Sequence, residues 1–172
     1  VMSNTIGIVI ATYNGEKYIE EQINSIINQT LKPDLIIISD GGSKDNTIEL
    51  SKKILSNSNI EYQILVSDKQ LSVKDNFEKG IRKCDTDIVF CADQDDYWLP
   101  TKIIDFLEAF ENNDAAMVFS NAYIVDEKLG KTGKTLWEAI GFYVNKDQLI
   151  FERADRNFLD ELNRHNVVTG MC

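Results

Sequence analysis

The chain alternates short, continuous apolar runs with longer segments in which apolar residues recur at helical spacing. Apolar runs rich in β-branched residues are typical of strands that are buried on both faces of a parallel sheet. Residues 6–11 (IGIVIA) and 35–39 (LIIIS) predict strands of this buried kind, and three further strands are predicted at residues 60–66 (IEYQILV), 87–92 (DIVFCA) and 115–120 (AAMVFS).

The segments between these strands predict helices, because each carries one apolar face. The first helix starts near Tyr18 and is broken by Pro33, and a second begins after Asp45, which can cap it. Residues 74–83 predict a third helix, and Pro100 opens a fourth. This alternation predicts an α/β fold, a three-layer α/β/α sandwich around a mostly parallel central sheet.

The last third of the chain gives weaker signals. AYIVD extends or follows the fifth strand, residues 128–146 indicate a loop, residues 155–164 indicate a helix, and residues 166–172 (NVVTGMC) look like the start of a strand. A domain that finishes on an unpaired apolar strand would expose an edge open to aggregation. We therefore expect residues 1–172 to form a single domain that is incomplete at its C-terminal end.

The composition is that of an ordinary globular protein, with a strongly acidic balance. The 28 Asp and Glu residues outnumber the 18 Lys and Arg residues, which gives a net charge of −10. This charge argues against non-specific binding to nucleic acid, which depends on lysine and arginine at the phosphates. If the ligand carries phosphate, a divalent cation would solve the resulting repulsion; the plain alternative is that the charge serves solubility.

No part of the sequence resembles a membrane span or a secretion signal. No apolar run approaches the ~20 residues that cross a bilayer, and the N-terminus lacks the basic and then apolar plan of a signal peptide. Cys84, Cys91 and Cys172 are odd in number and form no CxxC pair, which suits a reducing compartment. We expect a cytoplasmic protein, with peripheral association at the inner face of the cell membrane as an alternative.

Three polar segments directly follow predicted strands. They are ATYNGE after the first strand, SDGGSKDN after the second and ADQDD after the fourth. In an open parallel sheet, ligands bind beyond the carboxyl ends of the strands. Because the fold would bring all three segments to that edge, their convergence predicts a binding site there.

The acidic segment after the fourth strand is the clearest candidate for chemistry. Asp93 and Asp95 can direct their carboxylates around one cation if the strand turns there. Carboxylate oxygens favour Mg²⁺ or Mn²⁺, and a cation would offset the repulsion between neighbouring anions. The plain alternative is an acidic loop in which Asp96 caps the helix near Pro100, and the aspartates alone leave both interpretations open.

The other polar positions also have two interpretations each. SDGGSKDN can be a simple turn, because Asp-Gly and Gly-Gly are common turn formers. Tyr13 can stack on a nucleobase or pack at the strand end. Lys74 and Asn76 can meet phosphate or ribose, or be a solvated lysine and a capping asparagine. We assign no role to His165, the single histidine.

Taken in order, these segments resemble the family-two glycosyltransferases of the GT-A fold, the nucleotide-diphospho-sugar transferases. ATYNGEKYIEEQINSIINQT is similar to that family's first strand, nucleotide loop and helix, ISDGGSKDNT to its acidic turn, and DIVFCADQDDYWLPTKI to its metal-binding strand end. The DQDD-Trp version, with KDNF upstream, looks most like rhamnosyltransferase-type members of bacterial surface polysaccharide synthesis. The resemblance covers residues 6–120, and NVVTG is similar to a later segment.

This resemblance implies an inverting enzyme that uses Mn²⁺ or Mg²⁺. It would move a hexosyl or rhamnosyl group by a single displacement from a UDP- or dTDP-sugar to a glycan or lipid-linked acceptor. The catalytic base would come from a segment after the NVVTG strand, so we expect it after residue 172. By position, the cation would lie at Asp95 and Asp93. The residues implied in nucleotide binding are Ala11, Thr12, Tyr13, Glu16, Asp40, Asn76, Asp93 and Gln94.

The sequence departs from the family pattern at two positions. Gly41 stands where the family usually has a second acidic residue, one that commonly reads the base, and Ser72 stands where a glycine is often found. One alternative is therefore a nucleotide-binding GT-A domain with weak or no catalysis. Another is a flavodoxin-like signalling domain that binds Mg²⁺ at its strand ends, although that class needs a lysine partner at a later strand end that we do not find.

Overall fold

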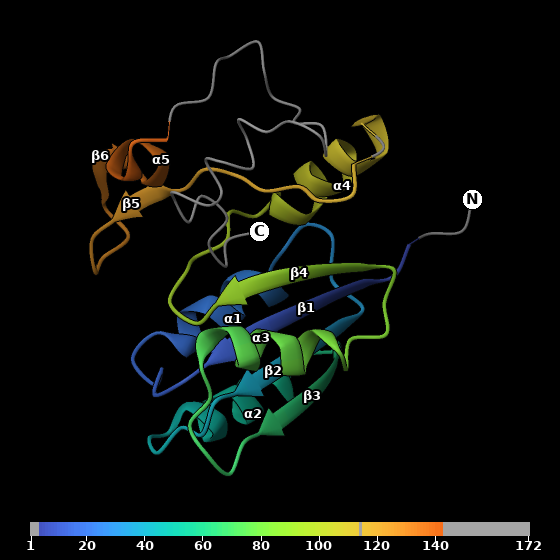
Figure 1. The fold of residues 1–172 in the computed structure, drawn as a ribbon, viewed down its shortest axis with the longest axis vertical. Coiled ribbons are helices and arrows are strands. Elements are labelled where there is room, and N and C mark those ends of the chain that lie inside the picture. Colours follow the sequence, from blue (N-terminus) through green and yellow to red (C-terminus); the bar gives the residue numbers. More distant parts are fainter. Residues whose placement is uncertain (1–3, 114, 143–172) are drawn as a thin grey trace. The chain divides into compact units, whose positions relative to one another are not determined.

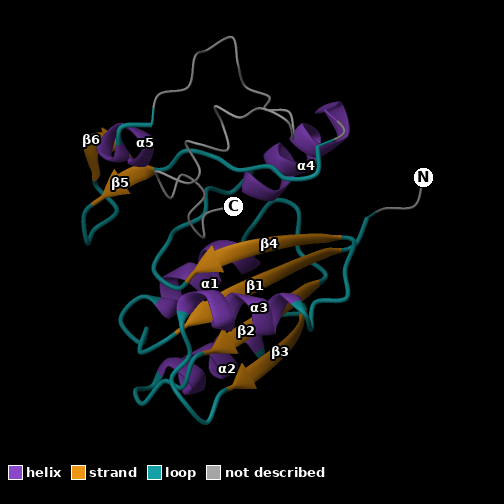
Figure 2. Ribbon diagram, in the orientation of Figure 1, coloured by secondary structure: helices purple, strands orange, loops and turns teal. Residues whose placement is uncertain are grey.

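The computed structural model describes residues 4–113 and 115–142, and its core is a parallel sheet of four strands (Figures 1 and 2). Four of the five predicted strands form this sheet. The strand order is β3-β2-β1-β4. Their bounds are β1 (Ile6–Thr12), β2 (Leu35–Asp40), β3 (Glu61–Val66) and β4 (Ile88–Asp93).

Helices cover both faces of this sheet, which confirms the three-layer sandwich. The helices α1 (Ile19–Ile27) and α2 (Thr47–Leu55) lie on one face, and α3 (Val73–Ile81) lies on the other (Figure 1). Because successive strand residues point to opposite faces, Val9 and Ile37 form the core under α3, where Phe77 packs against them.

A glycine allows α3 to approach the sheet closely. A Cβ atom at Gly80 would lie 2.4 Å from Cγ1 of Val9 and 3.1 Å from Cβ of Ser39. Four residues earlier on the same helix, the backbone oxygen of Asn76 accepts a hydrogen bond of 2.8 Å from the Ser39 hydroxyl. The helix is thus set against β1 and β2 by close packing and by a polar contact.

The chain after β4 returns across α1 before it enters α4 (Lys102–Asn113). The buried amide of Gln29, just beyond α1, donates to the backbone oxygen of Leu99 and accepts from the amide of Ile103, at 2.8 and 3.2 Å. The ring of Phe90 on β4 lies 5.7 Å from that of Trp98 and 5.6 Å from that of Phe106. These contacts fix the segment that follows the aspartates.

The chain divides into two compact units, residues 1–108 and 109–172. In the described part of the second unit, β5 (Tyr123–Val125) and β6 (Lys131–Thr135) pair antiparallel, and α5 (Leu136–Ile140) follows. Thr135 and Glu138 form a capping box at the start of α5. The ring of Trp137 lies 6.0 Å from that of Phe119 and 5.1 Å from that of Phe142.

Three predictions about elements are wrong in detail. Residues 115–120 form no strand, although they are apolar, and part of the predicted loop at 128–146 forms β6 and α5. The N-cap of α2 is Asn46, and Asp45 lies one residue earlier, where its carboxylate still accepts from the amide of Thr47. The helix predicted at 155–164 and the strand predicted at 166–172 lie outside the described residues. Among the described helices, none is long and apolar enough to cross a membrane.

Candidate functional site

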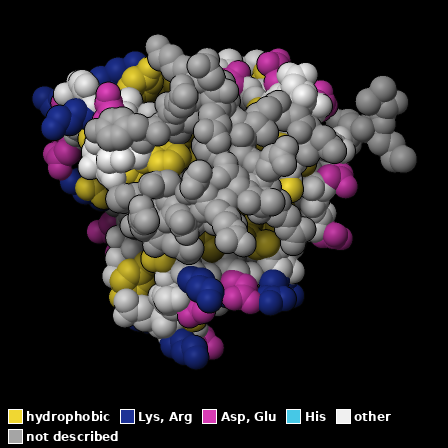
Figure 3. Space-filling view, turned by 45° about the horizontal axis from the view of Figure 1, so that its top comes forward, with side chains coloured by type: hydrophobic (Ala, Val, Ile, Leu, Met, Phe, Trp, Pro, Cys, Tyr) yellow, Lys and Arg dark blue, Asp and Glu magenta, His cyan; other side chains and the backbone are white. Residues whose placement is uncertain are grey.

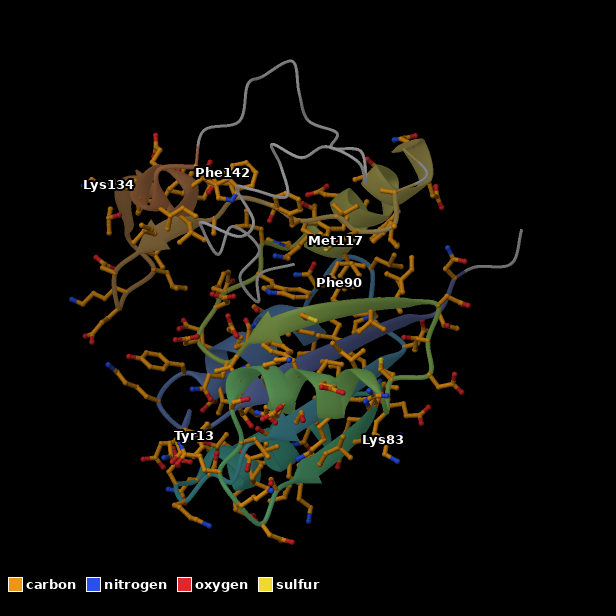
Figure 4. The ribbon with its side chains drawn as sticks, viewed as in Figure 1. Tyr13, Lys83, Phe90, Met117, Lys134 and Phe142 are labelled. Carbon is orange, nitrogen blue, oxygen red and sulfur yellow. The ribbon has the colours of Figure 1, made fainter. Side chains whose placement is uncertain are left out.

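The register of the sheet brings the three predicted polar segments together. Thr12 pairs with Asp40 across β1 and β2, and Ala11 pairs with Asp93 across β1 and β4. All four residues lie at the carboxyl ends of their strands. Figure 4 shows Tyr13 at the edge to which the strand arrows point. The predicted convergence of these segments is therefore confirmed.

The β1 loop (residues 13–16) is fastened to the β2 loop (residues 43–47) by hydrogen bonds in both directions. Backbone amides of the β1 loop donate to side chains of the β2 loop, and backbone and side-chain amides of the β2 loop donate to side chains of the β1 loop. The pairs are Asn14 N to Ser43 Oγ, Gly15 N to Thr47 Oγ1, Glu16 N to Asp45 Oδ2, Lys44 N to Asn14 Oδ1, and Asn46 N and Nδ2 to Glu16 Oε2.

Asn14 has a backbone conformation that few residues tolerate. Its φ angle is 48°, in the left-handed region, where asparagine is several-fold enriched over other non-glycine residues. Its side-chain oxygen at the same time accepts from Lys44 N at 2.8 Å. Asparagine thus satisfies the sharp turn of the loop and one of the contacts that hold it.

Asp40 is fully buried and organises the start of the β2 loop. Its carboxylate accepts hydrogen bonds from the Thr12 hydroxyl at 2.9 Å, from the amides of Gly42 and Ser43 at 2.9 and 2.8 Å, and from the Ser43 hydroxyl. Gly42 has φ 93°, a conformation in which a side chain would be strained. In this structure the Asp40 carboxylate therefore shapes the loop, and its contact with a nucleoside stays a prediction.

Asn76 is also buried, and it links α3 to the ends of β1 and β2. Its Nδ2 donates to the backbone oxygen of Thr12 at 3.0 Å, and its Oδ1 accepts from the Ser39 hydroxyl at 3.0 Å. A Cβ atom at Gly41 would lie 3.2 Å from Nδ2 of Asn76. A side chain at position 41 would therefore press against the side-chain amide of Asn76, which gives a physical reason for the glycine there.

Lys79 places a cation beside the β2 loop. Its ammonium group donates to the backbone oxygen of Asp40 at 3.0 Å. Burial lowers the pKa of Lys79, while the nearby charges of Asp40 and Asp68 act in the opposite direction. This lysine was not predicted from the sequence, because only the packing of α3 brings it to the loop.

The acidic segment after β4 gathers three carboxylates. Asp95 is exposed, Asp93 is half-buried, and burial together with the charges of Asp93 and Asp95 raises the pKa of Asp96 to about 7, against the opposing effect of Lys102. The Oδ2 atom of Asp96 is buried without a hydrogen-bond partner. The segment thus concentrates negative charge that the nearby lysine offsets only in part.

These oxygen ligands fit a hard divalent cation. Among residues 4–113 and 115–142, no group of three or more His, Cys, Asp or Glu side chains is arranged to hold a metal ion. Mg²⁺ typically takes one or two carboxylates and completes its shell with water and phosphate oxygens. Asp93 and Asp95 supply two carboxylates of the kind that such an ion takes, so the chemistry of the segment is compatible with a cation.

Gln94 joins this acidic segment to the β1 loop. Its side-chain oxygen accepts from the amide of Tyr13 at 2.9 Å, and its side-chain nitrogen donates to the backbone oxygen of Tyr13 at 3.1 Å. The three strand-end segments therefore form one connected edge.

The predicted site residues separate into two groups by burial. Those that a ligand can reach are Tyr13, Glu16 and Asp95, which are exposed, and Asp93 and Gln94, which are half-buried. Those in the buried support beneath them are Ala11, Thr12, Asp40 and Asn76. Ser43 and Thr47 belong to the same support and were not predicted from the sequence, since common turn and helix residues give no signal of such a role.

The comparison with family models decides the classification. Residues 7–171 match the model described as Glycosyl transferase family 2. The chain belongs to this family. Its parallel four-stranded sheet between helices is the GT-A fold that the family resemblance implied.

Curated relatives of this chain include two bacterial sugar transferases. It is 36% identical over 180 residues to the dTDP-rhamnosyl transferase RfbG of Shigella flexneri, an alignment that covers 95% of this chain and 61% of RfbG. It is 32% identical over 127 residues to the UDP-Glc:alpha-D-GlcNAc-diphosphoundecaprenol beta-1,3-glucosyltransferase WfaP of Escherichia coli, covering 69% of this chain and 46% of WfaP. The chain thus spans about three fifths or less of these relatives.

Solved glycosyltransferase structures share the fold at low sequence identity. S. aureus TarS 1-349 in complex with UDP matches with a TM-score of 0.55 and 17% identity, over 70% of this chain and 41% of TarS. The mannosyltransferase PcManGT from Pyrobaculum calidifontis, in complex with GDP-Man and Mn²⁺, matches with a TM-score of 0.60 and 15% identity, over 74% and 37% of the two chains. These likenesses concern the fold alone.

Proposed function

We propose that this glycosyltransferase moves a sugar, with inversion, from a nucleoside-diphosphate sugar to a hydroxyl of a saccharide or lipid-linked acceptor. The observation that carries the proposal is the connected edge of the sheet, where Gln94 joins the β1 loop to the acidic segment. One elongated ligand, with a base at one end and a diphosphate at the other, suits an edge that carries an exposed aromatic ring on one segment and a pair of carboxylates on the other.

The donor that we propose is a pyrimidine nucleoside-diphosphate sugar, with dTDP-rhamnose as the first candidate and a UDP-hexose as the second. The name of RfbG, a dTDP-rhamnosyl transferase, supports the first candidate. The Tyr13 ring is 38% exposed and can stack on the base. Asp40, Thr12 and Asn76 act from beneath, because they hold the two loops that shape the base site.

The diphosphate end of the donor belongs at the acidic segment. We propose that Asp93 and Asp95 hold a Mg²⁺ or Mn²⁺ ion, which when bound offsets the negative charge of the departing diphosphate. The structure of PcManGT, a complex with GDP-Man and Mn²⁺, supports this assignment. We assign the base that deprotonates the acceptor to none of the described residues, so their part in the reaction is to bind and orient the donor.

The proposal is tested by calorimetry of dTDP, UDP and GDP with and without Mn²⁺. We expect dTDP or UDP to bind best, and to bind at least about tenfold more weakly without the metal or in Asp95→Asn, a loss of about 1.4 kcal/mol. Asp85→Asn is the matched control, since Asp85 is an exposed aspartate that precedes β4 at the opposite end of that strand. A nucleotide affinity that is unchanged both without the metal and in Asp95→Asn would contradict the assignment.

A further inference from the structure

The contact between Gln94 and Tyr13 joins two segments that are 81 residues apart in sequence. Both polar atoms of the Gln94 side chain take part, with the oxygen accepting from the Tyr13 amide and the nitrogen donating to the Tyr13 carbonyl. This orientation of the side-chain amide is required, because a backbone N–H needs an acceptor and a backbone carbonyl needs a donor. The contact is a ring of two hydrogen bonds that holds the main chain of the β1 loop.

Gly15 gives independent evidence that the β1 loop is shaped around this amide. A Cβ atom at position 15 would lie 2.2 Å from Oε1 and 2.5 Å from Cδ of Gln94. Gly15 is not among the glycines with positive φ, so the conformation of the chain does not demand a glycine there. The absent side chain therefore makes room for Gln94.

Gln94 connects the β1 loop to the two aspartates because it lies between them in the acidic segment. Gln94 lies between Asp93, which ends β4, and Asp95. The β1 loop is fastened to the β2 loop on its other side through Asn14 and Gly15. The side-chain amide of Gln94 thus ties the main chain that carries the Tyr13 ring to the segment that carries the two carboxylates.

We propose that Gln94 is a positioning residue that fixes the spacing between the base site at Tyr13 and the cation site at Asp93 and Asp95. This inference rests on the proposed function and replaces the direct contact with the nucleotide that the family resemblance implied for Gln94. A ligand whose two ends are covalently joined gains affinity from both ends only when the two subsites are held at matching distance. Loss of the amide should therefore lower the affinity for the joined ligand and leave the affinities for its separate parts nearly unchanged.

The experiment compares Gln94→Met with the wild-type protein on three probes with Mn²⁺ present. Methionine keeps the length of the side chain and removes both hydrogen bonds. We expect the affinity for the nucleoside diphosphate to fall about tenfold, while the affinities for inorganic pyrophosphate and for the free nucleoside, followed by NMR titration, change less than about twofold. Gln63→Met on the exposed surface of β3 is the matched control, and we expect it to leave all three affinities unchanged.

A second variant tests the contact from its other side. Gly15→Ala keeps the amide of Gln94 but displaces it, and we expect the same selective loss for the joined ligand. Both changes break the same contact. The affinity of the double variant for the joined ligand should therefore be no lower than that of whichever single variant binds it more weakly. Additive losses would show that the two residues act separately and would overturn the proposal.

Two other results would also overturn it. If Gln94→Met lowers the affinity for pyrophosphate or for the free nucleoside as much as the affinity for the joined ligand, Gln94 contacts that part directly. If the joined ligand binds Gln94→Met as tightly as wild type, the spacing does not depend on this amide. Failure of the wild-type protein to bind any nucleoside diphosphate is a distinct result, which overturns the proposed function itself.

Discussion

Asp40 is the residue on which the architecture of the candidate site depends most. Its buried carboxylate accepts four hydrogen bonds, from the Thr12 hydroxyl, the Gly42 and Ser43 amides and the Ser43 hydroxyl. Without this acceptor, two backbone amides in a buried turn would lose their partner. The hydrogen bonds that the structure shows for this carboxylate hold the loop, and the nucleoside contact that the family resemblance implies stays a prediction.

We predict that Asp40→Ala lowers the free energy of unfolding by about 3 kcal/mol, because buried donors left without an acceptor are costly. Urea denaturation monitored by circular dichroism measures this change. Asp68→Ala is the control, since Asp68 is exposed in the segment after β3. Equal stability of Asp40→Ala and the control would show that the carboxylate does not hold the loop.

The sequence was sufficient to predict which polar segments meet at the edge of the sheet but not how their side chains are placed there. Asp40 and Tyr13 stand out because each lies at or just beyond the end of a buried apolar run. Which of them faces a ligand depends on strand register and on the path of each loop, and local pattern does not encode these. Lys79 shows the same limit, because its contact with the Asp40 carbonyl arises from the packing of α3.

At the scale of elements, α3 packs closely against the sheet at Gly80, which carries no side chain. Alanine at an exposed helix position is favoured over glycine by about 1 kcal/mol. Here the added Cβ would lie 2.4 Å from Val9, far inside contact distance. Overpacking of this kind typically costs about 1–3 kcal/mol, so the clash outweighs the gain in helix propensity.

We therefore predict that Gly80→Ala lowers the free energy of unfolding by about 1–2 kcal/mol. It should also loosen the contact of Asn76 with Thr12, which hydrogen exchange at the ends of β1 and β2 would detect. Lys74→Ala, at an exposed position on the same helix, supplies the comparison. A Gly80→Ala protein more stable than wild type would mean that the helix can move away from β1 at little cost.

Elements were predicted well where burial on both faces of the sheet dictates composition. The runs at 6–11 and 35–39 are of this kind, and both are strands. Residues 115–120 have a similar composition but form no strand, because a strand needs a partner as well as apolar side chains. The hairpin and α5 were missed, although the Thr135-to-Glu138 spacing is that of a capping box.

For the whole molecule, the distribution of charge matters more than its sum. On the face shown in Figure 3, Lys and Arg side chains lie among Asp and Glu side chains, and the coloured atoms show no continuous basic surface. The net charge is −10 and the isoelectric point is about 4.6, so the protein loses its net negative charge in the pH range in which carboxyl groups take up protons. Carboxylates held by native hydrogen bonds therefore decide how stability changes with pH.

Asp45 is such a carboxylate. Burial raises the pKa of Asp45, but hydrogen bonds from the Thr47 hydroxyl and from the amides of Glu16 and Thr47 outweigh it, so the pKa lies below its usual value of 3.8. Since the folded state favours the ionised form, this contribution to stability is present above about pH 4 and is lost as the pH falls through the folded pKa. The loss affects the contact between the β1 and β2 loops.

We predict that Asp45→Asn is less stable than wild type by about 1 kcal/mol at pH 7, and that the difference shrinks as the pH falls below about 4. Urea denaturation at pH 7 and at pH 3 measures both values. Asp68→Asn, at an exposed aspartate in the segment after β3, is the control measured at the same two pH values. A difference of the same size at both pH values would mean that the ionised form of Asp45 has no special role in the fold.

The contact between Gln94 and Tyr13 has a further consequence for engineering. Gln94 forms hydrogen bonds with main-chain atoms at position 13, so the side chain there can be replaced without loss of these bonds. The ring that we propose to stack on the nucleobase can therefore be replaced, whereas the main chain of the loop beneath it cannot. On the proposed function, we expect substitutions at position 13 to change the preference among nucleobases while the β1 loop keeps its place.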